Sequence, residues 1–193
     1  MLFPKNPLSV LRDGRNGVLT AQREILAQIR PGTDASTLLD TGWILTAADR
    51  LYQQLGQLIE ARATARQIAQ LAPRRWALRS ATRTADRAAA QLALLAGSVM
   101  HLTRTVAAAN NAGTVVAEPL RAALDDLATA GAALADDLPA LAAAHAASAR
   151  RNAAKLRSTT PTTTDTLLAD IIDTCADELH QVVDLKPQCK SVD

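Results

Sequence analysis

The chain has 193 residues and a net charge of +2, and 48% of its residues are hydrophobic although only 2% are aromatic. Much of the apolar content is alanine, which favours helices and buries little area per residue. We therefore expect a thin, elongated core between closely packed helices. Long period-two runs of Val, Ile, Tyr and Thr are absent, so a β-sheet is not expected.

The sequence also lacks the marks of several other classes of protein. Its two cysteines, Cys175 and Cys189, form no CxxC pair or metal spacing, so neither a zinc site nor a disulfide framework is expected, and a reducing compartment is the default. No stretch reaches about 18 uncharged apolar residues. The start, MLFPKNPLSVLRDG, has no long apolar segment of the kind found in signal peptides. We expect that this chain does not itself span a bilayer.

Prolines and glycines divide the chain into helices. A first amphipathic helix is expected over about 8–29, with the turn RPGTD after it, and a second over about 35–72. The apolar positions of the second helix alternate steps of four and three, as in a bundle or coiled coil. This seam is Ile44, Ala48, Leu51, Leu55, Leu58, Arg62, Ala65, Ala69 and Ala72.

A third helix is expected over about 73–109, with Pro73 at its first position, where the missing N–H costs nothing. NNAG ends it, because Asn and Gly suit a left-handed cap. Its seam also alternates steps of three and four. The seam residues are Leu78, Ala81, Ala85, Ala88, Leu92, Leu95, Val99, Leu102 and Val106.

The next apolar seam continues through Pro139 without losing register, with Leu134, Leu138 and Leu141 in sequence. Although Pro139 removes one helical hydrogen bond, this continuity predicts one kinked helix over about 118–156. The predicted fold is all-α, an elongated antiparallel helical bundle of three long helices plus shorter N- and C-terminal helices.

The domain organisation follows from these elements. Residues 1–157 form the bundle domain, and the polar stretch STTPTTTD at 158–165 is a linker. An amphipathic helix is expected over 166–184, and 185–193 form a disordered tail.

The stretch LAPRRWALRSATRTADR, residues 71–87, contains five arginines and one acid, Asp86. Arg75, Arg79, Arg83 and Arg87 step by four on the side away from the seam. One interpretation is a solvated helix face. The other is a contact with phospholipid headgroups, an acidic partner helix or an anionic ligand, which the planar guanidinium suits. Residues 158–193 carry seven acids and two bases, so the last helix is an available partner.

Arg62 occupies a core-facing position, with Arg66 one turn later. Arg62 either snorkels or pairs with an acid of another helix, or the two arginines receive a carboxylate ligand. His145 continues an apolar seam and is expected to be hydrogen-bonded inside the bundle, with a pH-sensitive or ligand role as the alternative.

Three of the four aromatic residues, Trp43, Tyr52 and Trp76, fall in the second and third helices. We interpret them as packing anchors. The alternative is that they line a ligand-binding site, and in that case Trp76 is the candidate ligand contact beside Arg62 and Arg66.

No catalytic motif is present: GxSxG, Walker, GxGxxG and HExxH patterns are all absent. Asp177 and His180 lie three apart without the further ligands of a di-iron bundle, and Cys175 is expected to be inert packing. The basic run has no helix-turn-helix signature, so nucleic-acid binding is not expected. We therefore predict no enzyme, no cofactor, no catalytic residue and no metal site.

Three stretches carry a family resemblance. They are MLFPKNPLSVLRDG, the hairpin LTAADRLYQQLGQLIEARATARQIAQLAPRRWALRSATRTADR, and EPLRAALDDLATAGAALADDL, which together cover roughly residues 1–140. In their order and composition they resemble the cytosolic region of bacterial aromatic acid exporter-like membrane proteins, the fusaric acid resistance family.

The resemblance implies a soluble domain at the cytoplasmic face of the cell membrane, following a membrane domain that precedes Met1. It implies a regulatory, assembly or substrate-collecting role in the efflux of aromatic carboxylic acids. The implied partners are the protein's own membrane domain, other subunits of a homo-oligomer, membrane headgroups and anionic aromatic small molecules. The alternative is a stand-alone helical scaffold or surface-binding module for lipid or protein partners.

Overall fold

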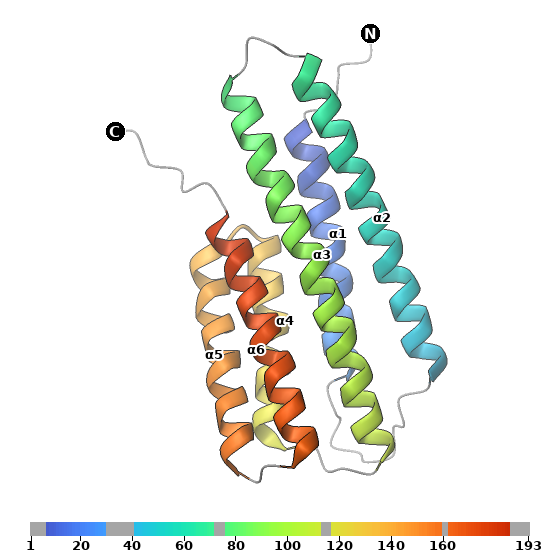
Figure 1. The fold of residues 1–193 in the computed structure, drawn as a ribbon, viewed down its shortest axis with the longest axis vertical. Helices are drawn as coiled ribbons and strands as arrows, with labels where there is room; N and C mark the ends of the chain where they lie inside the picture. Colours follow the sequence, from blue (N-terminus) through green and yellow to red (C-terminus); the bar gives the residue numbers. More distant parts are fainter. Residues whose placement is uncertain (1–6, 30–40, 72–75, 113–116, 160–161, 186–193) are drawn as a thin grey trace.

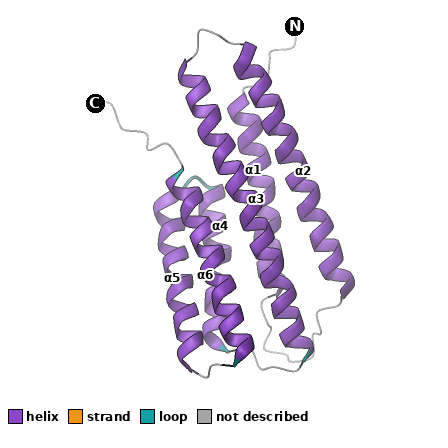
Figure 2. Cartoon of the chain, in the orientation of Figure 1, coloured by secondary structure: helices purple, strands orange, loops and turns teal. Residues whose placement is uncertain are grey.

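The computed structural model describes the helices of the chain and the short turns next to them (Figures 1 and 2). The described residues are 7–29, 41–71, 76–112, 117–159 and 162–185. They form six α-helices and no strand, which confirms the predicted all-α class. The helices are α1 (Pro7–Ile29), α2 (Thr41–Leu71), α3 (Trp76–Asn111), α4 (Glu118–Ala135), α5 (Pro139–Thr159) and α6 (Thr163–Asp184).

The helices stand side by side in two groups of three (Figure 1). In the first group α2 packs on α1 and α3, and in the second α5 packs on α4 and α6. The groups meet where α1 contacts α4 and where α3 contacts α6. The central core therefore lies between α1, α3, α4 and α6, and α2 and α5 lie on its outside.

The prediction of one kinked helix through Pro139 is wrong. α4 ends at Ala135, and the chain turns at Asp137, whose φ is 62°. The N–H of Leu138 donates to the carbonyl of Ala133 at 2.8 Å and closes the turn. Pro139 then begins α5, because the first position of a helix needs no N–H donor. The continuous apolar register was misleading, since Leu138 is 50% exposed.

The α4–α5 turn changes the predicted architecture. Only α2 and α3 are long, with 31 and 36 residues, whereas α4 has 18 and α5 has 21. Arg15 of α1 donates from Nη2 to Oδ1 of Asp137 at 2.8 Å and fastens the turn to the first group. The expected third long helix is instead an antiparallel hairpin that packs with α6.

The seam of α3 is buried as predicted in its second half but not in its first. Toward the start of α3 the buried side includes Thr82 and Ala89, while Ala85 and Ala88 are only half-buried. A straight helix has 3.6 residues per turn and drifts away from a seven-residue repeat, which accounts for the shift. The seam residues at most 2% exposed are Leu92, Leu95, Val99, Leu102 and Val106.

Alanine forms the inner side of α5. Its fully buried alanines step by four and three along the helix, so α5 can approach α4 and α6 closely. This agrees with the thin core expected from the alanine-rich composition. The four alanines, each at most 1% exposed, are Ala142, Ala146, Ala149 and Ala153.

Glycine has a similar effect where α1 meets α2. A Cβ added to Gly14 would lie 3.3 Å from the Cα of Leu58, a backbone atom that cannot easily yield. Gly14, a residue type that is unfavourable inside a helix, therefore permits the close packing of α1 with α2.

In the described part of the chain, Thr82–Asn111 of α3 is the one helical stretch long and apolar enough to cross a membrane. Length and composition alone give this result, and 56% of the apolar window is buried inside the bundle. The core helix of a soluble bundle has the same properties, and α3 occupies that place between α1, α2 and α6.

Candidate functional site

Two arginines of α2 share one carboxylate of α3. Nε of Arg62 lies 2.7 Å from Oδ1 of Asp86, and Nη2 of Arg66 lies 2.6 Å from Oδ2. The hydrogen bond from Arg62 is the main reason that the pKa of Asp86 is lowered, and it acts against the opposite effect of burial. Of the interpretations open for Arg62, an ion pair with an acid of another helix is the one present in the structure.

The shared carboxylate leaves positive charge on this pair of helices. Each guanidinium carries five N–H donors, and the bonds to Asp86 use Nε of Arg62 and Nη2 of Arg66. The side chain of Arg66 is 55% exposed, whereas that of Arg62 is 22% exposed. The group has two cations for one anion, so its net charge is positive.

Two further arginines flank Asp86 on α3. Arg83 and Arg87 are both exposed, and within the described residues neither has an ion pair with a carboxylate. Arg75 lies outside the described residues, as do the side chains of Trp76 and Arg79. We call Arg62, Arg66, Arg83 and Arg87 the arginine end.

A small apolar cluster underlies the arginine end. The buried residues Leu11, Ala61 and Ala65 pack together, with Val10 and Ala85 against them. This cluster joins the first turns of α1 to the end of α2 and the start of α3. The first turns of α1 and the arginines therefore lie toward the same end of the molecule (Figure 1).

Three acids of α6 pair with arginines of α5, and among the described side chains none pairs with Arg83 or Arg87 of α3. Nη2 of Arg157 lies 2.7 Å from Oδ1 of Asp170 and 2.6 Å from Oδ2 of Asp173, and these hydrogen bonds raise the pKa of Arg157. Arg150 pairs with Asp177. The acidic helix that the sequence offered as a partner for the basic run is thus engaged elsewhere.

His145 is hydrogen-bonded inside the bundle, as expected. Its Nδ1 lies 3.0 Å from Oδ1 of Asp126 in α4, and Nδ2 of Asn152 donates to Oδ2 of the same carboxylate at 3.0 Å. Asn152 is 8% exposed. One acid of α4 therefore holds two side chains of α5 and fixes the hairpin.

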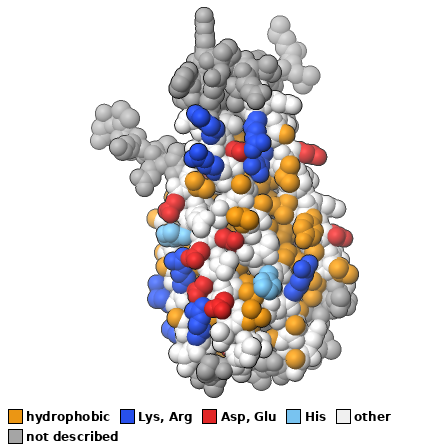
Figure 3. Space-filling model, viewed as in Figure 1, with side chains coloured by type: hydrophobic (Ala, Val, Ile, Leu, Met, Phe, Trp, Pro, Cys, Tyr) orange, Lys and Arg blue, Asp and Glu red, His pale blue; other side chains and the backbone are white. Residues whose placement is uncertain are grey.

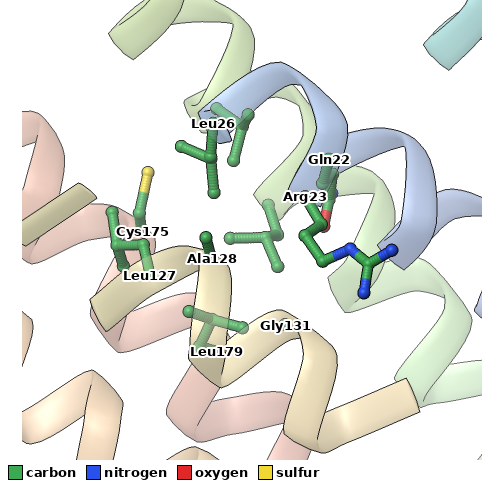
Figure 4. Close-up of a pocket in the computed structure, with 10 residues that line it drawn as sticks. Gln22, Arg23, Leu26, Leu127, Ala128, Gly131, Cys175 and Leu179 are labelled. Atoms are coloured by element: carbon green, nitrogen blue, oxygen red, sulfur yellow. The ribbon is translucent and has the colours of Figure 1, made fainter. Parts of the chain in front are cut away.

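The centre of the bundle contains a cavity of only about 10 Å³, where α1, α3, α4 and α6 meet (Figure 4). A space of this size holds at most one water molecule. The amide Nε2 of Gln22 is buried and has no hydrogen-bond partner in the described part of the chain. Cys175 also lines the cavity, and burial raises the pKa of its thiol, which agrees with an inert packing role.

Sequence reasoning missed the role of Asp86. The signal was present, because Asp86 is the one acid among six bases in residues 73–113. An isolated acid inside a basic run indicates a shared partner for neighbouring cations. Within the described residues, no group of three or more His, Cys, Asp or Glu side chains is arranged to hold a metal ion.

Comparison with known proteins adds a functional class. No family model and no solved structure matches the chain. Proteins named "Putative arylamide transporter" from Mycobacterium bovis and Mycobacterium tuberculosis are 43% identical to it over 184 residues, which is 95% of this chain and 51% of each relative. The chain therefore spans about half the length of these curated relatives. Homology at this level supports a transporter-related family, in agreement with the transporter class implied by the sequence resemblance.

Proposed function

We propose that the chain is the cytosolic domain of an integral membrane transporter for aryl compounds, and that it acts in assembly of the transporter. The support comes from homologues named as arylamide transporters, of which this chain matches about half. In this proposal the transport path belongs to the other half of the protein. Among the described residues, the one helix long and apolar enough to cross a membrane already serves as the core of the bundle.

The observation that carries the assembly role is an exposed apolar row on α2. Leu45, Tyr52 and Ile59 are 63%, 58% and 59% exposed and follow one another at every seventh residue. A row with this spacing stays on one side of a helix and suits contact with another helix. Apolar side chains gather on this side of the molecule (Figure 3). Covering each of these side chains would contribute up to about 1.5–3 kcal/mol.

A substrate-collecting role for Arg62, Arg66 and Trp76 stays a prediction. Both arginines already bind Asp86, so a carboxylate ligand would have to use their remaining N–H groups. Assembly needs no such rearrangement and is the role that the geometry favours. The proposal assigns no catalytic residue to the chain.

The test uses the complete protein that contains this chain, expressed in membranes. Accessibility of introduced cysteines should place residues of α2 on the cytoplasmic side, and cross-linking should capture oligomers. We expect the double substitution Tyr52→Gln with Ile59→Gln to weaken the oligomer. Leu167→Gln, at a residue 44% exposed on α6, is the matched control and should leave it unchanged.

Two results would count against the proposal. A complete protein without hydrophobic helices outside this chain would favour the stand-alone scaffold. An equal loss of oligomer in the control would show that the α2 row has no special part in assembly.

A further inference from the structure

We propose that the arginine end binds the phosphate groups of anionic phospholipids, so that the part of the α2–α3 pair that carries these four arginines lies against the headgroups. The inference rests on the proposed function in one respect, because a membrane portion of the same protein would bring this end to the lipid surface.

The first support is an excess of positive charge. The arginine end has four arginines on two neighbouring helices, and Asp86 binds two of them, Arg62 and Arg66. Figure 3 shows basic side chains gathered at the upper end of the described surface. Asp13 and Glu60 are also exposed near this end but line a shallow hollow between α1 and α2, whereas the arginines lie along α2 and α3.

The second support is that the arginines are held in place. Asp86 fixes the guanidiniums of Arg62 and Arg66 at 2.7 and 2.6 Å, which reduces the side-chain entropy that would be lost on binding. The N–H groups that do not bind Asp86 form forks of the kind that bind phosphate oxygens in pairs. Arg83 precedes Asp86 in the sequence and Arg87 follows it, and each adds one exposed cation.

The third support is the contrast with two arginines of α5. Arg150 and Arg157 on α5 are neutralised by three acids of α6. Exposed arginines also lie elsewhere, as at Arg104 and Arg151, but the arginine end places four arginines on two neighbouring helices around one acid. The first turns of α1 lie near the arginine end, because the apolar cluster around Leu11 joins α1 to α2 and α3.

A lipid surface fits this patch better than a nucleic acid does. Single strands are bound in basic grooves where bases stack on aromatic side chains. The arginine end is instead a patch along the neighbouring helices α2 and α3. A headgroup layer can meet such a patch without stacking on aromatic side chains, and each basic residue near an anionic surface adds to the attraction.

The experiment measures co-sedimentation of the 193-residue chain with vesicles of phosphatidylcholine alone and of phosphatidylcholine mixed with phosphatidylglycerol. We expect binding to the mixed vesicles only, and weaker binding as salt increases. The double substitution Arg83→Gln with Arg87→Gln should lower the partition coefficient roughly 25-fold, about fivefold for each charge. The matched control is Arg104→Gln with Arg151→Gln, at two exposed arginines outside the arginine end, and it should change binding little.

A second variant makes the arginine end more positive. Asp86→Asn removes the acid and should strengthen binding to the mixed vesicles about fivefold. Circular dichroism confirms that each variant remains helical. A purely structural role for Asp86 would give no such gain.

Several results would overturn the proposal. These are no binding to the mixed vesicles, equal binding to phosphatidylcholine alone, or equal losses in the control pair. Displacement by inorganic phosphate beyond that by chloride at the same ionic strength would indicate a small-anion site instead. Preferential binding of a nucleic acid would also count against it. None of these outcomes bears on membrane topology, so the proposed function would be judged separately by the cysteine mapping.

Discussion

The two halves of this bundle use arginine in different ways. In the α4–α6 group Arg150 and Arg157 of α5 pair with three acids of α6, and one acid of α4 binds His145 and Asn152. In the α1–α3 group two arginines share Asp86, and Arg83 and Arg87 have no carboxylate partner within the described residues. Arg150 and Arg157 are therefore neutralised within the α4–α6 group, whereas the arginine end of the α1–α3 group keeps a net positive charge.

The largest expected effect tests whether the two groups form one folding unit. Leu179 of α6 is 2% exposed and lines the central cavity with residues of α1, α3 and α4. Leu179→Ala should cost about 2–5 kcal/mol of unfolding free energy, and urea unfolding should show a single shifted transition. Leu167→Ala, at an exposed position of the same helix, should cost much less. Two separate transitions would mean that the groups fold independently.

The next effect tests the internal charge matching of the α4–α6 group. Asp126→Ala removes the partner of both His145 and Asn152 and should destabilise the chain by about 1–3 kcal/mol, because partly buried polar groups lose their bonds. Asp49→Ala on α2, where the acid is exposed, is the control for loss of a carboxylate. Equal melting temperatures for the two variants would contradict the assigned role of Asp126.

The pH dependence of stability should distinguish Asp86 in the α1–α3 group from Glu178 in the α4–α6 group. The pKa of Asp86 is lowered chiefly by Arg62, so its stabilising effect is present at neutral pH and is lost as the pH falls below about 4. Burial raises the pKa of Glu178 and outweighs a hydrogen bond with Ser98, which acts in the opposite direction. Ionisation of Glu178 therefore costs stability above about pH 4.3.

Asp86→Asn should therefore lower the melting temperature at pH 7, and the difference from the native chain should vanish in acid. Glu178→Gln should raise the melting temperature at pH 7, and this gain should also vanish in acid. Thermal unfolding across the pH range measures both. Shifts of the same sign for the two variants at neutral pH would refute the assignment.

The smallest effect concerns the surface pairs of α5 and α6. Arg157→Gln removes two ion pairs at a side chain that is 35% exposed, and such pairs contribute only about 0–1 kcal/mol. Chemical denaturation should thus show a small loss that shrinks in high salt. A loss as large as that of Asp126→Ala would mean that these surface pairs help to hold the hairpin.

The sequence was sufficient for the helices but not for their arrangement. Alternating apolar steps located α2 and α3, and the buried seam from Leu92 to Val106 follows the predicted register. The same reasoning failed at Pro139, because an apolar register can continue across a turn by coincidence. Whether Pro139 kinks a helix or begins one depended on the left-handed conformation of Asp137 and its contact with Arg15. Both are tertiary features, and the spacing of apolar residues along the sequence does not reveal them.

The candidate site was predictable to a similar extent. Helical spacing placed Arg83 and Arg87 away from the seam, and both are exposed. The inward position of Arg62 predicted a partner on another helix, but not which one. Asp86 could be chosen only once α2 and α3 were brought together, because it lies 24 residues from Arg62 in the chain. The acids of α6 were equally available in the sequence, and three of them pair with α5 instead.

The most direct test of the account compares two positions on α3 in the complete protein, reconstituted in vesicles that contain phosphatidylglycerol and a lipid-bound quencher. Ala90 and Ala108 are both exposed, and 18 residues of helix separate them by about 27 Å. Fluorophores are attached at Ala90→Cys or Ala108→Cys, with the native cysteines replaced by serine. We expect stronger quenching at position 90, next to the arginine end, than at position 108. Equal quenching, or stronger quenching at position 108, would contradict it.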